Sequence, residues 1–170
     1  MMTRNLVIGL AAAVSLVAVS LSSRADDEFL ATVIRELPQA AVSLQQAVKT
    51  SESEGNPISA EFDVEDGELQ ISVYTSQGDH FDEVTIDPKS GSIKSAKPLS
   101  DAKEINDAQA QSAALDKSKL PLSAVLNAAV DANMGYRAVS IIPMLGDNEA
   151  VARITLLRGD DIKQITEKLD

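Results

Sequence analysis

The sequence predicts an α+β protein built from two tandem units, each a helix followed by a three-stranded antiparallel sheet, after a cleaved signal peptide. Three observations lead to this fold. Residues 59–85 align without a gap on residues 140–166, at a shift of 81 positions. Both copies show the alternation of apolar and polar residues that is typical of half-buried strands. An uncharged, apolar run precedes both copies near the N-terminus.

The internal repeat consists mainly of turn residues and apolar positions. Six positions are identical in the two copies, and the apolar positions between them agree in kind, which is what two copies of one supersecondary unit should show. Strands built on this pattern should bury Leu69, Ile71, Val73, Ala152 and Ile154 against the helices. The identical pairs are Ser59/Ser140, Asp66/Asp147, Glu68/Glu149, Gly78/Gly159, Asp79/Asp160 and Thr85/Thr166.

Residues 1–25 have the pattern of a signal peptide. Arg4 precedes the apolar run Leu6–Leu21, and Ser23-Arg24-Ala25 places small residues at the positions that a signal peptidase reads. As a helix the run would span about 24 Å, less than the roughly 30 Å of a bilayer core. Cleavage after Ala25 would release a periplasmic or secreted bacterial protein without a membrane anchor. The alternative is an uncleaved anchor.

The first unit is expected within residues 26–94. Ser43 and Gln46 have the spacing of a capping box, which favours a helix that begins at Leu44. Asp66-Gly67 is a strong signal for a two-residue hairpin turn. The expected elements are helical segments at Glu28–Ala41 and Leu44–Glu52 and strands at Ile58–Val64, Leu69–Val73 and Phe81–Ile86.

The second unit is expected within residues 121–170, after a stretch at 95–120 that is rich in Ala, Gln, Asp, Lys and Ser. This stretch fits a weakly amphipathic helix and a solvated linker equally well. The equivalent of the first hairpin turn is Asp147-Asn148. The expected elements of the second unit are a helix at Ser123–Asn133 and strands at Tyr136–Ile142, Ala150–Leu157 and Asp161–Leu169.

The first unit resembles a PepSY domain. The resemblance rests on Leu44-Gln45-Gln46-Ala47 in the helix, on the Asp66-Gly67 hairpin, and on the closing stretch Val84–Ile93, which contains Asp-Pro-x-x-Gly. It covers Val42–Ile93, and the second unit is similar in pattern over Leu122–Asp170. It implies a helix packed on a curved antiparallel sheet, with two such units side by side, as in β-lactamase-inhibitory-protein-like folds. It also implies binding or inhibition without catalytic residues.

Composition and charge exclude several function classes. The chain has a net charge of −11, and cleavage after Ala25 would remove two of its 15 basic residues and leave 13 against 26 acidic ones. Such a charge repels nucleic acid and anionic membranes and favours cationic partners. The absence of cysteine rules out thiol catalysis, disulfides and thiolate metal sites. No cofactor is expected.

The acidic strand contains the first group of candidate binding residues. Glu61, Asp63 and Glu65 alternate along one expected strand face, about 6–7 Å apart, and Asp66 follows in the turn. These carboxylates could collect Ca²⁺ or a basic loop of a partner, although their order is not that of an EF-hand. The alternative is the solvated face of an amphipathic strand, which also discourages edge-to-edge aggregation.

An apolar segment of the second unit is the other candidate. Pro143, Met144 and Leu145 fall in the stretch that corresponds to the acidic strand of the first unit, and they form either a contact patch or a plug between the units. His80 is the only histidine, and nothing nearby marks a nucleophile, an orienting residue or a metal-ligand set, so a surface role is expected.

Two functions follow from these observations. The first is an exported, non-enzymatic protein-interaction module that binds or inhibits a peptidase or another envelope protein. The alternative is a periplasmic protein that binds a small ligand or a cation in the groove between the units or on the acidic strand. Neither function requires a catalytic residue.

Overall fold

The computed structural model describes residues 30–146 and 149–169. The expected signal peptide and the expected turn at Asp147-Asn148 lie outside the described residues. The helices are a helical stretch at residues 30–36 followed by the short 3-10 helix η1 (Leu37–Gln39), then α2 (Leu44–Ser51), α3 (Ala102–Leu115) and α4 (Leu122–Ala132). The strands are β1 (Asn56–Glu65), β2 (Glu68–Gln77), β3 (His80–Ile86), β4 (Ile93–Pro98), β5 (Arg137–Leu145), β6 (Ala150–Arg158) and β7 (Asp161–Lys168).

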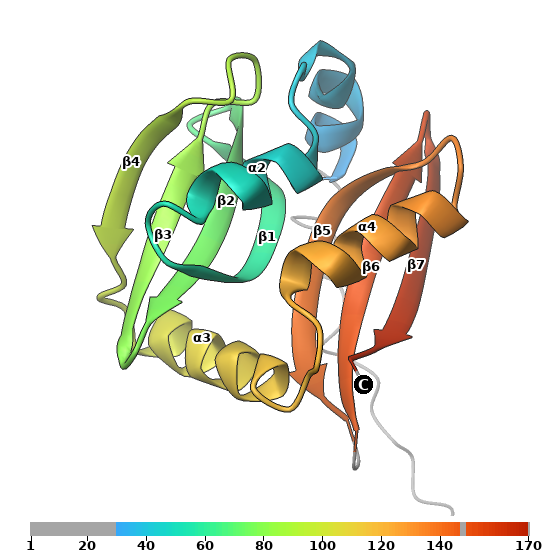
Figure 1. Cartoon of the computed structure of the whole chain (residues 1–170). Helices are drawn as coiled ribbons and strands as arrows, with labels where there is room; N and C mark the ends of the chain where they lie inside the picture. The colour runs from blue at the N-terminus through green and yellow to red at the C-terminus, as the bar shows by residue number, and fades with distance from the viewer. Residues whose placement is uncertain (1–29, 147–148, 170) are drawn as a thin grey trace, which may run out of the picture.

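All seven strands belong to one antiparallel sheet, in the order β4-β3-β2-β1-β5-β6-β7 (Figure 1). The α+β class is confirmed, but the expectation of two three-stranded sheets is wrong. The strands of the first half number four, because residues after the Asp-Pro-x-x-Gly turn pair with β3 as β4. The two halves are also joined, because β1 pairs directly with β5 in the middle of both strands, at Ala60↔Ile141 and Glu61↔Ser140.

The two halves of the sheet share one register. Ala60 of β1 lies opposite Val73 of β2, and their partners in the repeat, Ile141 and Ile154, lie opposite each other in β5 and β6. A register shift between Pro57 and Ser59 recurs between Ala138 and Ser140. At the junction Ala60 pairs with Ile141, its own counterpart in the repeat. The halves are therefore related by an approximate two-fold axis at this pair.

The hydrophobic core lies between one face of the sheet and the helices α2 and α4, which cross the sheet side by side (Figure 1). The expected burial is confirmed for four of the five strand residues, and Leu69 is half-buried against the core. Because core residues of both halves join one cluster, the burial of apolar surface stabilises the two halves together. The four fully buried residues are Ile71, Val73, Ala152 and Ile154.

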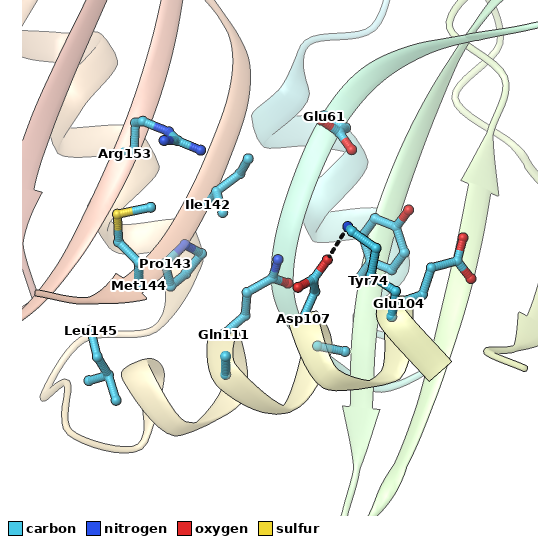
Figure 2. Close-up of a pocket in the computed structure, with 13 residues that line it drawn as sticks. Glu61, Tyr74, Glu104, Asp107, Gln111, Ile142, Pro143, Met144, Leu145 and Arg153 are labelled. Atoms are coloured by element: carbon cyan, nitrogen blue, oxygen red, sulfur yellow. Dashed lines mark hydrogen bonds and ion pairs between the residues drawn. The ribbon is translucent and has the colours of Figure 1, made fainter. Parts of the chain in front are cut away.

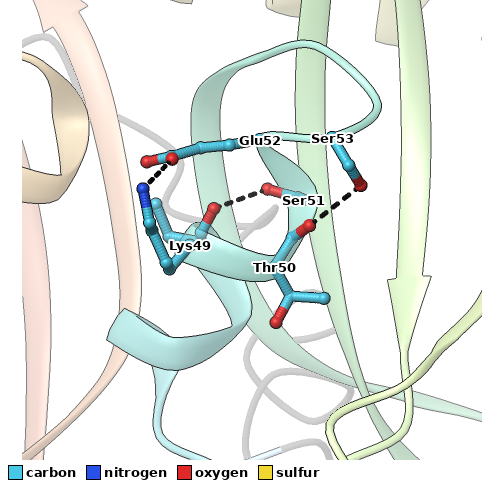
Figure 3. Close-up of polar contacts among 6 residues, drawn as sticks. Lys49, Thr50, Ser51, Glu52 and Ser53 are labelled. Carbon is cyan, nitrogen blue, oxygen red and sulfur yellow. Dashed lines mark hydrogen bonds and ion pairs between the residues drawn. The ribbon is translucent and has the colours of Figure 1, made fainter.

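Local hydrogen bonds define both ends of α2. The expected capping box is present: the Ser43 hydroxyl accepts a hydrogen bond from the Gln46 amide, and the Gln46 side chain accepts one from the Ser43 amide. At the other end the Ser51 hydroxyl donates to the carbonyl of Val48 at 2.8 Å, and the Ser53 hydroxyl donates to the carbonyl of Thr50 at 3.2 Å (Figure 3). These bonds satisfy carbonyls that the helix leaves unpaired.

The stretch between the two units forms α3, which lies on the opposite face of the sheet. Asp101 caps its N-terminus by accepting hydrogen bonds from the amides of Lys103 and Glu104. The hydroxyl of Ser59 donates to Gln111 Oε1 at 2.6 Å and so ties α3 to β1. Because side chains alternate along a strand, Ser59 and Phe62 face opposite sides, and Phe62 belongs to the core.

Candidate binding cleft

A cleft of about 640 Å³ lies between α3 and the sheet, at the junction of the two halves (Figure 2). β1 and β2 contribute residues to it from the first half, β5 and β6 contribute from the second, and α3 lies along one side. The cleft thus corresponds to the inter-unit groove. It contains four of the residues singled out from the sequence: Glu61, Pro143, Met144 and Leu145.

One end of the cleft is acidic. Glu61 is half-buried and its carboxylate has no hydrogen bond or ion pair with any other described residue. Burial raises the pKa of Glu61, and the charges of Asp63 and Glu83 raise it further. The sequence placed Glu61 on an open solvent face. The structure differs because α3 covers this part of the sheet.

Tyr74 and Glu104 extend this acidic end. Tyr74 follows on the neighbouring strand β2, where burial, and then the charges of Glu83 and Glu61, raise the pKa of its hydroxyl. Glu104 projects from the first turn of α3 and is exposed. Its side chain makes no ion pair within the described chain, so it adds a second uncompensated negative charge beside Glu61.

The polar residues of α3 beside these acids are already paired. Lys103 Nζ lies 2.8 Å from Asp107 Oδ2, one helical turn along. The dashed line at Asp107 in Figure 2 marks this ion pair. This contact neutralises both charges locally, and as an exposed i,i+4 pair it contributes only about 0.3–0.5 kcal/mol to stability. Gln111 is held by its bond to Ser59. The uncompensated charge of the cleft therefore comes from Glu61, Glu104 and Arg153.

The other end of the cleft combines apolar side chains with Arg153. Ile142 and Met144 are half-buried, Pro143 is buried, and Leu145 is 46 % exposed. The expected contact patch is thus exposed at Leu145 alone, and the rest of the segment forms a wall of the cleft (Figure 2). Arg153 of β6 lies opposite Ile142 and has no ion pair or hydrogen bond among the described residues.

Three of the predicted site residues lie outside the cleft. Asp63 is half-buried, and its carboxylate accepts a hydrogen bond from the Val64 amide at 2.7 Å. Glu65 and Asp66 are exposed at the hairpin, where Asp66 has a φ of +52° as the turn requires. Of the acidic strand, only Glu61 therefore lines the cleft.

Sequence analysis missed Tyr74, Arg153 and the residues of α3. The repeat contains a signal for one of them: the counterpart of Arg153 is Ser72, and the counterpart of Ile142 is Glu61. These two positions, which point away from the core, thus differ sharply between the copies. Nothing in the sequence indicated that α3 would fold over them.

His80 is exposed at the start of β3, away from the cleft. Across residues 30–146 and 149–169, no group of three or more His, Asp and Glu side chains is placed to hold a metal ion. Among the helices in the same ranges, none has the length and apolar character needed to cross a membrane.

Comparison with known proteins yields no relative. No protein-family model matches this chain, no curated protein is significantly similar to it, and no solved structure is significantly similar to its fold. The resemblance to PepSY domains therefore stays a prediction.

Proposed function

We propose that this chain is an exported, non-enzymatic binding protein whose ligand occupies the cleft between the two PepSY-like units. One observation carries the proposal: both halves of the sheet, together with α3, build one cleft that contains unpaired charged groups of both signs beside apolar side chains. Its volume falls in the range of small-molecule sites, about 300–1,000 Å³. A few polar groups among apolar ones can fix a ligand's orientation without catalysing a reaction.

The favoured ligand is a small molecule rather than a protein. The cleft has a volume of about 640 Å³, which is the size of a small-molecule site. An extended peptide that added a strand would need a long open edge for its main-chain hydrogen bonds. The facing edges of β1 and β5 are joined in their middle, at Ala60↔Ile141 and Glu61↔Ser140, so a compact ligand held by side chains suits this site better.

A second candidate function is the capture or inhibition of an envelope protein, such as a peptidase. Leu145 supports it, because this side chain is 46 % exposed next to the β5–β6 hairpin. Leu145 adjoins the apolar wall of Ile142 and Met144, and contiguous exposed apolar surface marks protein interaction sites. The negative net charge would favour a basic partner.

A steric block of the cleft tests the first proposal. Ala110 is exposed on α3 and lines the cleft, so Ala110→Trp would fill it without entering the core. Ala113 is exposed on the same helix outside the lining, and Ala113→Trp is the matched control. Native mass spectrometry after incubation with the low-molecular-mass fraction of a periplasmic extract should show a bound species on the wild type and on the control alone.

A pull-down from the same extract tests the second candidate. Leu145→Ser should then release the captured protein, whereas Ala110→Trp should leave capture unchanged. For the first proposal the contrary outcome is that Ala110→Trp and Ala113→Trp both bind every small molecule as the wild type does. In that case the cleft is not the site.

A further inference from the structure

We infer that the cleft binds a small zwitterion, with its cationic group at Glu61, its carboxylate at Arg153, and an apolar stem over Ile142. The inference rests on the proposed function and names the ligand class for the same cleft. It starts from the arrangement of two charged side chains that line one cleft and have no partner among the described residues.

The register of the sheet sets the spacing of the two strand positions that carry these charges. Glu61 lies opposite Ser140 of β5, Ser140 lies opposite Thr155 of β6, and Arg153 is two residues along from Thr155. With strands about 4.8 Å apart and a rise of about 3.4 Å per residue, the Cα atoms of Glu61 and Arg153 are roughly 12 Å apart. The structure has no ion pair between them. A ligand with charges at both ends can bridge the gap.

The residue between the two charges is apolar. Ile142 lies on β5, the strand between β1 and β6, and directly opposite Arg153. Its side chain is half-buried and lines the cleft, and Met144 continues the same wall (Figure 2). Methylene groups of a ligand would be removed from water there, at about 0.8 kcal/mol per buried CH₂. The middle of the ligand should therefore be a hydrocarbon stem.

The surroundings of each charge agree with this orientation. Glu61 shares its end of the cleft with Glu104 and lies near Asp63 and Glu83, so a cation is favoured there. Lys103, the nearest cation on α3, is already paired with Asp107. Burial and the neighbouring carboxylates both raise the pKa of Glu61, which means that its charged form lacks compensation. A ligand ammonium would supply it.

A series of unbranched ω-amino acids, from β-alanine to aminooctanoic acid, is the probe. Titration of the full mature chain, followed by amide NMR shifts, should show perturbation at Ile142 and Met144. Affinity should peak at one chain length. An alkylamine or an alkyl carboxylate of that length should bind about tenfold more weakly, because each lacks one charge-assisted hydrogen bond. A flat dependence on length would overturn the inference.

Charge-removing variants test the assignment of each end. Glu61→Gln and Arg153→Gln should each weaken binding of the best ω-amino acid about tenfold. After Glu61→Gln the ligand should bind no better than the alkyl carboxylate, and after Arg153→Gln no better than the alkylamine. Glu65→Gln on β1 and Lys117→Gln after α3 remove the same charges outside the cleft and should bind as the wild type does. Equal loss in all four variants would overturn the inference.

The remaining outcomes separate this inference from the proposed function. If no ω-amino acid binds but Ala110→Trp still abolishes binding of another small molecule from the extract, the zwitterion is wrong and the cleft remains the site. If the extract also gives no ligand that Ala110→Trp displaces, both proposals fail. A lysine-terminated peptide that binds more tightly than the best free ω-amino acid would overturn the assignment to a small ligand.

Discussion

The two halves of the sheet have the same register. On the side that faces α3, however, their surfaces differ in chemical character. On the core side, Val73 and its counterpart Ile154 are both apolar and fully buried. On the α3 side, Glu61 has Ile142 as its counterpart. Core positions of a repeat must stay apolar, although their size can differ: Ile71 and its counterpart Ala152 are both fully buried. The other face is free to diverge, and here the divergence produces an acidic end and an apolar end.

The helix α3 converts this divergence into a site. α2 and α4 cover corresponding parts of the core face, and both halves need such a helix to bury their apolar strands. α3 instead packs on β1, β5 and β6, across the junction. A single helix laid over a pseudo-symmetric sheet meets different residues from each half. The cleft is asymmetric because its two walls come from unlike copies.

The largest expected effect is the loss of the shared core. Ile71 is fully buried, and Ile71→Asp would bury an unpaired charge, at a cost of several kcal/mol. The folded state should be lost in both halves at once, because one core cluster spans them. Ile162→Asp on β7 is the control, since Ile162 is 42 % exposed and should lose about 1 kcal/mol or less. Circular dichroism and urea unfolding measure both, and a folded second half in Ile71→Asp would contradict a shared core.

The next effect concerns Arg137, which has no equivalent in the first half because its counterpart is the exposed Asn56. Its guanidinium donates to the carbonyl of Leu37 at 2.9 Å and to those of Ala40 and Val42 at 3.2 Å. Lysine cannot form this fork, so Arg137→Lys should cost about 1–3 kcal/mol in unfolding free energy.

The control for this variant is Arg158→Lys. Arg158 is exposed, and its ion pair with Asp161 at 3.0 Å should contribute less than about 1 kcal/mol. Urea titration compares the two variants. Hydrogen exchange of residues 37–42 should increase in Arg137→Lys alone, and unchanged exchange there would show that the fork does not hold this segment.

Equivalent turns should respond equally. Gly78 precedes β3 and Gly159 precedes β7, and both have a φ of +63° with no atom close to an added Cβ. Alanine at either position would be strained by about 1–2 kcal/mol through the backbone alone. Gly78→Ala and Gly159→Ala should therefore lower the unfolding free energy by the same amount, measured by urea titration. Gly146→Ala, where φ is not positive, is the control, and a clear difference between the two test variants would break the equivalence of the copies.

The smallest effect is a dependence of the unfolding free energy on pH. It should arise at Glu61 of the first half and have no equivalent at the counterpart Ile142 in the second half. The pKa of Glu61 is raised in the folded state, so the Glu61 carboxylate binds a proton more tightly in the folded protein than in the unfolded protein. The stability gained by protonation is full below the unfolded pKa and is lost as pH rises through the folded pKa. Glu61→Gln should remove this loss and flatten the curve of unfolding free energy against pH.

Glu65→Gln is the control for the pH experiment, because Glu65 is exposed and lies outside the cleft. It should leave the pH dependence as in the wild type. A curve that keeps its wild-type slope in Glu61→Gln would mean that Glu61 is not the group responsible.

Local patterns in the sequence were sufficient for most of the elements. Alternation predicted the strands, Ser43 and Gln46 predicted the start of α2, and Asp66-Gly67 predicted the first hairpin, because each feature depends on neighbours a few residues away. The repeat predicted the corresponding strands of the second half. Tertiary structure alone decided the rest. The pairing of β1 with β5 depends on two edges distant in the chain, and β4 depends on an edge of β3 left open.

The cleft residues divide in the same way, into those that the sequence identified and those that only the tertiary structure brought together. The sequence by itself identified Glu61, as part of an acidic strand, and the apolar segment Pro143–Leu145 as candidate binding residues. It did not bring them together, and it did not include Arg153. Their meeting depends on the β1–β5 junction and on where α3 lies, and both are set by long-range burial and hydrogen bonding that no local pattern encodes.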